Sequence, residues 1–113
     1  MKVKKYEKSK YIDSFHLAGF EYYDGLDIID ELTIGTKVSL NLETDNPHDP
    51  NAIAIYYDMY KLGYVPANHN LALATYLYYG YADIFEARIQ SKDLEEHPER
   101  QFRVVVKIID NRK

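Results

Sequence analysis

The chain of 113 residues contains no cysteine, no tryptophan, only five glycines and four prolines, and no long run of apolar residues. Without cysteine, a disulfide bond or a thiolate metal site is excluded. A membrane-spanning helix needs about 18 or more consecutive apolar residues, so we expect none. The basic start has no apolar segment behind it, which argues against a secretory signal. The simplest expectation is a cytoplasmic protein.

Patterns that would indicate catalysis are also missing. The four histidines lack the paired spacing of a zinc site, and there is no glycine-rich phosphate loop. Asp24 and Asp49 could pair for acid–base chemistry, but nothing else in the sequence points to a reaction. We therefore predict a non-enzymatic protein with no catalytic residues, no metal and no cofactor.

Charge divides the chain into two parts. The formal net charge is −4, yet residues 1–10 contain five lysines and one glutamate, so the remaining residues carry −8. We predict a flexible basic arm over 1–10 and a single domain over 11–113. An acidic domain is unusual for nucleic-acid binding, although a pocket that holds a chain end contacts few phosphates.

Aromatic and apolar residues are plentiful: apolar types make up 46% of the chain and there are twelve tyrosines. This composition is typical of a globular protein. Tyrosine suits a partly buried strand surface, and an exposed tyrosine can stack on a nucleic-acid base.

Alternating apolar residues predict a mainly β fold. Ile53, Ile55, Val104 and Val106 are the expected core residues. A helix is expected over 68–79, with Asn68 as N-cap and Gly80 after its end. Apolar residues spaced three apart over 26–32 leave room for a short second helix. The expected strands cover residues 14–20, 37–43, 51–57, 62–65, 85–90 and 102–109.

The most informative segment is the loop before the strand at 51–57. Residues 45–51 contain two prolines and four Asn or Asp residues in seven positions. Proline restricts φ, and Asn and Asp side chains bond to nearby backbone, so the loop should be rigid and polar. With Tyr22-Tyr23-Asp24-Gly25 upstream, it could form one small binding cleft.

These residues carry a family resemblance. The strings Tyr22-Tyr23-Asp24-Gly25, Asn46-Pro47-His48-Asp49-Pro50-Asn51-Ala52-Ile53 and Leu62-Gly63-Tyr64-Val65-Pro66 resemble the HIRAN domain over roughly residues 14–109. The domain occurs near the amino terminus of DNA-repair translocases and as a stand-alone bacterial protein. The resemblance implies a small modified OB-like barrel of about six strands that binds single-stranded DNA and captures its free 3′ end. We therefore expect a module that recognises single-stranded DNA ends or damaged DNA.

The same resemblance implies where DNA would bind. Asp49 would accept a hydrogen bond from a 3′-hydroxyl and would repel a phosphorylated end. The tyrosines would stack on bases. Each residue also has a purely structural interpretation, such as turn capping by Asp49 or coverage of the barrel end by Tyr64. The implied nucleic-acid-binding residues are Tyr22, Tyr23, Asn46, His48, Asp49 and Tyr64.

Two positions depart from the family pattern and leave an alternative open. Glu21 stands where DNA-binding members have arginine, and Ala67 stands where they have lysine. Both changes remove a cation. The alternative is a protein-interaction or oligomeric adaptor that keeps the fold without DNA affinity. A third interpretation, ranked below both, is a small-molecule or nucleotide-binding barrel that uses the same cleft. The two missing cations could be replaced by other basic residues of the domain, namely Lys61, Arg88, Arg103 and Lys107.

Overall fold

The computed structural model describes residues 8–112, and most of the predicted basic arm lies outside this range. Six antiparallel strands form one sheet in the order β1-β6-β5-β2-β3-β4, which confirms the mainly β fold. The strands are β1 (Ser9–His16), β2 (Lys37–Leu42), β3 (Ile53–Tyr57), β4 (Tyr60–Tyr64), β5 (Phe85–Lys92) and β6 (Phe102–Ile109).

The sheet curls but does not close along its whole length. Its two edge strands are β1 and β4, and they are linked just beyond β1 by one bridge between Ala18 and Tyr64. Each of these residues donates its backbone N–H to the other's carbonyl at 2.9 Å. Gly63 permits this approach, because an added Cβ would lie 2.3 Å from the Ala18 carbonyl oxygen. The result is an open sheet compatible with an OB-like barrel.

The inner face of the sheet forms one apolar core. In β2, Val38 is buried and Ser39 is exposed, as the alternating pattern predicts. The four predicted core residues Ile53, Ile55, Val104 and Val106 are all fully buried. Phe15, Phe20 and Phe102 add the bulkiest buried side chains, and the rings of Phe20 and Phe102 are 4.6 Å apart.

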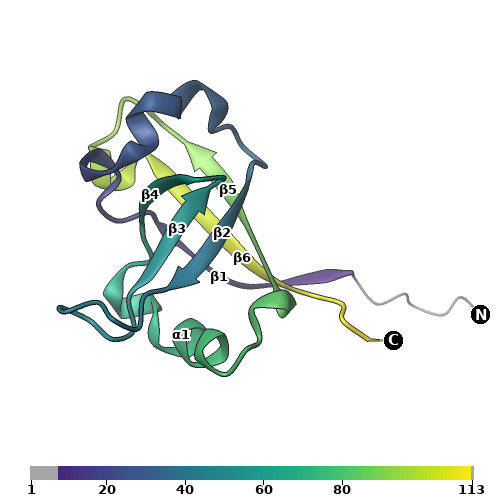
Figure 1. The fold of residues 1–113 in the computed structure, drawn as a ribbon. Coiled ribbons are helices and arrows are strands. Elements are labelled where there is room, and N and C mark those ends of the chain that lie inside the picture. The colour runs from purple at the N-terminus through teal and green to yellow at the C-terminus, as the bar shows by residue number, and fades with distance from the viewer. Residues whose placement is uncertain (1–7, 113) are drawn as a thin grey trace, which may run out of the picture.

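Helical segments lie at the two ends of the sheet (Figure 1). The helix α1 (Leu71–Tyr78) packs at one end, where Leu73 and Ala74 are buried. At the other end are two 3₁₀ segments, η1 (Phe20–Tyr22) and η2 (Asp24–Glu31). Segment η2 confirms the short second helix. The remaining 3₁₀ turns are η3 (Ala67–His69), η4 (Ala82–Ile84) and η5 (Pro98–Arg100).

Several predicted boundaries were wrong. The first strand runs over 9–16 rather than 14–20, because its amino-terminal half pairs with the end of β6. This strand includes Ser9 and Lys10, which the sequence placed in the basic arm. The main helix begins at Leu71, since residues around Asn68 form η3 instead. Gly80 follows the helix with a left-handed φ of 92°, as predicted.

Candidate nucleic-acid interface

The loop at 43–52 is held by bonds from its own side chains. The Asn46 side-chain oxygen accepts hydrogen bonds from the backbone N–H groups of His48 at 2.8 Å and Asp49 at 3.0 Å. One carboxylate oxygen of Asp49 accepts from the N–H of Asn51 at 2.8 Å. These are Asx-type turns, and they fix the backbone as the composition predicted. The turn-capping interpretation of Asp49 therefore holds.

Asp49 is also tied to the start of α1. Its second oxygen accepts a hydrogen bond of 2.9 Å from the side-chain nitrogen of Asn70. Asn70 is only 4% exposed, so this contact is shielded from water. Because each carboxylate oxygen can accept more than one hydrogen bond, half-buried Asp49 keeps acceptor capacity toward solvent.

Beside this loop, three side chains form a closed hydrogen-bonded triangle. The Tyr64 hydroxyl donates to Glu43 Oε1 at 2.7 Å and accepts from Lys61 Nζ at 2.6 Å. Lys61 Nζ also donates to Glu43 Oε2 at 3.0 Å. Asn46 joins through its side-chain nitrogen, which donates to Glu43 Oε1 at 3.1 Å.

This arrangement stabilises the charged forms of both ionic groups. Burial alone would raise the pKa of Glu43, but hydrogen bonds from Tyr64, Lys61 and Asn46 outweigh it and hold the pKa below its ordinary value. Burial likewise opposes the charge on Lys61, but its bonds to Tyr64 and Glu43 raise its pKa. The pKa of Tyr64 is raised by burial and by its bond to Glu43.

Tyr23 completes what we call the interface cluster: Tyr23, Glu43, Asn46, Lys61 and Tyr64. The Tyr23 ring meets the Tyr64 ring edge-on, with centroids 5.6 Å apart. Lys61 Nζ lies 4.9 Å from the centre of the Tyr23 ring and 4.5 Å from that of Tyr64, within cation–π distance. The cluster thus joins the residue between η1 and η2, the loop after β2, and β4 into one polar and aromatic surface.

Two predicted site residues lie outside these contacts. Tyr22 is 75% exposed, and its pKa is raised mainly by the neighbouring carboxylate of Glu21. His48 is exposed on the loop and is held through its backbone N–H. Among the residues described, neither side chain makes a hydrogen bond or ring contact with the interface cluster. Tyr23, Asn46 and Tyr64 are therefore the predicted residues that the structure brings together, with Asp49 bonded to Asn46.

Sequence reasoning missed the roles of Glu43, Lys61 and Asn70. Glu43 follows directly after β2 and reads as the last outward residue of an alternating strand. Lys61 was one of four compensating cations, and nothing in the sequence singled it out. Of the other three, Arg88 bonds to Glu86 and Gly35, and Arg103 bonds to Ser14.

The described part of the chain contains no group of three or more side chains arranged to hold a metal ion. Within the same residues, no helix has the length and apolarity needed to cross a membrane.

Comparison with known proteins identifies the class. The family model of the HIRAN domain matches residues 13–108, so the chain belongs to the HIRAN domain family. A crystal structure of a protein from Lactobacillus plantarum matches with a TM-score of 0.76 and 22% identity, over 91% of this chain and 97% of that one. The crystal structure of the HIRAN domain of human HLTF matches with a TM-score of 0.61 and 19% identity, over 90% and 78%. No curated protein matches.

Proposed function

We propose that this protein is a non-enzymatic DNA-binding module that recognises single-stranded ends carrying a free 3′-hydroxyl. The observation that carries the proposal is membership of the HIRAN family over residues 13–108. The contacts of Asp49 and of the interface cluster support it, because they hold the Asp49 carboxylate in place and tie its loop, through Asn46, to the cluster that contains the Tyr23 and Tyr64 rings.

In this proposal Asp49 reads the end of the strand. Its carboxylate is positioned by Asn51 and Asn70 before any ligand arrives, so accepting a bond from a 3′-hydroxyl needs little reorganisation. A 3′-phosphate has no donor when ionised and carries like charge, so it is disfavoured. The exposed ring of Tyr22, together with Tyr23 and His48, supplies stacking surfaces.

Lys61 would be the cation nearest the ligand. It is shared between Glu43 and two tyrosine rings, so it offers only part of its charge to a phosphate. With Glu21 in place of an arginine, few phosphates would be contacted. We expect weak binding with a shallow salt dependence, roughly 0.7 log units per phosphate for single strands.

The test is a fluorescence anisotropy titration at low salt with two labelled oligonucleotides that differ only in a 3′-hydroxyl or a 3′-phosphate. The hydroxyl form should bind more tightly, and Asp49→Ala should remove the difference. Asp45→Ala is the matched control, because Asp45 is an exposed carboxylate of the same loop. Equal affinity for both oligonucleotides in the wild type would end the proposal of 3′-end recognition.

A protein-interaction adaptor is the second candidate function. The pairing of Lys61 with Glu43 favours it, because that pair leaves little free positive charge at the interface cluster. Absence of binding to either oligonucleotide at low salt would make this candidate the better one.

A further inference from the structure

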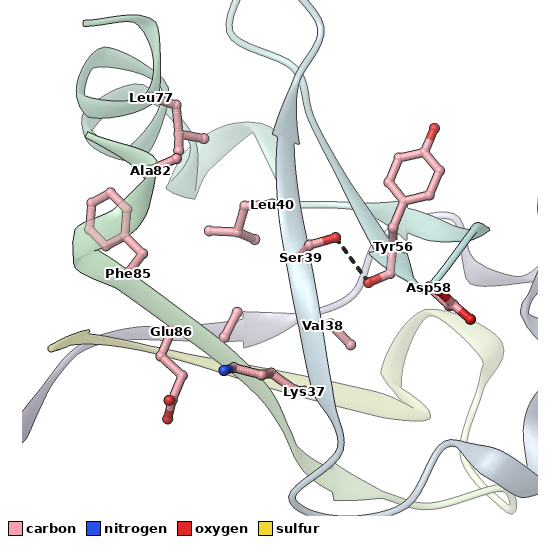
Figure 2. Close-up of a pocket in the computed structure, with 11 residues that line it drawn as sticks. Lys37, Val38, Ser39, Leu40, Tyr56, Asp58, Leu77, Ala82, Phe85 and Glu86 are labelled. Carbon is pink, nitrogen blue, oxygen red and sulfur yellow. Dashed lines mark hydrogen bonds between the residues drawn. The ribbon is translucent and has the colours of Figure 1, made fainter. Parts of the chain in front are cut away.

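A groove lies between strands β2 and β5, on a part of the surface that contains none of the predicted DNA-binding residues. Its cavity has a volume of about 420 Å³. Figure 2 shows Leu40 of β2 facing Phe85, Ala82 and Leu77, which approach from β5, η4 and α1. A second hollow of about 350 Å³ shares Leu40, Leu77 and Ala82 and continues to Leu42. Together they form one groove along β2 with an apolar floor.

The groove exists because β2 and β5 separate. They pair only at Lys37 with Arg88 and at Val38 with Ala87. Beyond Val38, β2 remains paired with β3 on its other edge. Within residues 8–112, no strand pairs with the groove edge of 39–42.

The backbone groups that face the groove can be assigned from the hydrogen-bond pattern. In an antiparallel ladder, successive residues point their N–H and C=O groups to opposite edges. Glu43 donates its N–H to the carbonyl of Ala52, the residue just before β3, so the N–H and C=O groups of residues 41 and 39 also point toward β3. Leu40 and Leu42 therefore direct their N–H and C=O groups into the groove. Backbone donors and acceptors spaced two residues apart match another polypeptide strand.

Exposed tyrosines occur in the segment that contributes Tyr78 and Ala82 to the second hollow. Tyr78 itself, and Tyr79 and Tyr81 that follow it in the chain, are each more than half exposed. Tyr78 and Tyr79 meet edge-on with centroids 5.1 Å apart. Tyrosine is enriched at protein–protein interfaces because it buries a large ring and keeps a polar tip.

The charges around the groove favour a basic partner over a nucleic acid. The lining includes the carboxylates of Asp58 and Glu86 and one lysine, Lys37. Asp83 is exposed beside Ala82. Arg88 pairs with Glu86 at 3.0 Å and donates to the Gly35 carbonyl, so the charges of Glu86 and Arg88 offset each other. Asp58 and Asp83 then outnumber Lys37 by one negative charge, which favours a peptide with lysine or arginine over phosphates.

We propose that this groove binds an extended, basic polypeptide segment of a partner protein, which adds as a strand to the free edge of β2. The peptide backbone pairs with Leu40 and Leu42, and one apolar side chain inserts among Leu40, Leu77 and Phe85. This is β-augmentation, in which backbone pairing provides affinity and the pocket provides specificity. The site is separate from the proposed DNA interface and does not depend on it.

The test is an amide NMR titration of the whole protein with three synthetic heptapeptides. The first alternates valine with lysine, the second has the same sequence with the amides of one edge N-methylated, and the third replaces lysine with glutamate. We expect saturable shifts at 39–42 and Phe85 with the first peptide. The other two should bind at least about tenfold more weakly, since each loses backbone pairing or charge attraction.

Substitutions in the groove test where the peptide contacts the protein. Leu77→Lys should abolish the shifts, whereas Leu71→Lys, on an exposed position of the same helix, should not. If Leu77→Lys impairs folding, Leu42→Pro removes an N–H that faces the groove while leaving the β3 pairs intact, and it should weaken binding too. Equal binding of the N-methylated peptide, or no saturable shift at millimolar peptide, would overturn the proposal. So would groove shifts produced by single-stranded DNA or by raising the concentration of the protein alone.

Discussion

Strand β2 separates two regions that use their polar groups in opposite ways. In the interface cluster, the bonds are made within the protein: both oxygens of Glu43 accept hydrogen bonds, and Lys61 is shared among three groups. In the groove, the backbone groups of Leu40 and Leu42 point into an open channel with an apolar floor. A preformed polar surface suits a ligand recognised by shape and by a few hydrogen bonds. A free strand edge suits a ligand that brings its own backbone.

The comparison also shows that a cavity and a polar site need not coincide. The 420 Å³ hollow is lined by none of the six predicted DNA-binding residues. The convergence of tyrosines, a carboxylate and an amide occurs instead on the β4 side of the molecule.

The largest expected effect comes from the core that supports both regions. Ile53 is fully buried, and its side chain belongs neither to the interface cluster nor to the groove lining. Ile53→Ala should lower the free energy of unfolding by about 2–5 kcal/mol, because it removes buried methyl groups and leaves a cavity. Urea denaturation measures the change. Ile34→Ala, at an exposed position, should change stability by no more than about 0.5 kcal/mol; similar losses in the two variants would contradict the assigned core.

A smaller effect should distinguish the interface cluster from the groove. Glu43→Gln removes a charge that accepts three side-chain bonds, whereas Glu86→Gln at the groove rim removes one that accepts a single side-chain bond, from Arg88. We expect a loss of about 1–2 kcal/mol for Glu43→Gln and a smaller loss for Glu86→Gln. Thermal unfolding at pH 7 compares the two variants, and a loss for Glu43→Gln no larger than that for Glu86→Gln would contradict this ranking.

Acid should act on the same residue. Because the folded pKa of Glu43 lies below its ordinary value of 4.5, its contribution is present above pH 4.5 and is lost as the pH falls through the folded pKa. The stability difference between the wild type and Glu43→Gln should therefore shrink below pH 4.5. Urea unfolding at a series of pH values measures this, and a difference that grows on acidification would contradict the assigned ionisation.

The smallest effect concerns charge at the edge of the interface. Glu21→Arg should tighten binding of single-stranded DNA several-fold, because it replaces a repelling carboxylate with a bidentate phosphate donor. The slope of log affinity against log salt should steepen by roughly 0.7 if one phosphate is gained. Anisotropy titrations at several salt concentrations give both values. An unchanged slope would place Glu21 away from the bound strand.

Much of the core was predictable because apolar residues recur at every second position of the strands. Ile53, Ile55, Val104 and Val106 follow this period and are all buried, although Ala54 and Val105 between them are buried too. The rigid loop was predictable for the same local reason, since Asn46 and Asp49 bond to backbone within three residues.

The features that the sequence did not predict depend on contacts between residues far apart in the chain. The Asn70 side chain bonds to Asp49 across the fold rather than capping α1, so no local signal marks it. Glu43 and Lys61 are 18 residues apart and meet only because β3 pairs with β2 on one edge and with β4 on the other. The groove likewise arises because β2 and β5 diverge after two paired positions. Neither strand's own sequence indicates where that pairing stops.

The central claim, that the loop and the interface cluster hold a DNA end, is tested most directly by amide NMR with an unmodified short oligonucleotide bearing a 3′-hydroxyl. The account predicts saturable shifts at 46–51 and at Tyr23 and Tyr64, with residues 39–42 of the groove edge unaffected. The matching 3′-phosphate oligonucleotide should give weaker shifts at the same positions. No shifts at the loop at low salt, or shifts confined to the groove, would contradict it.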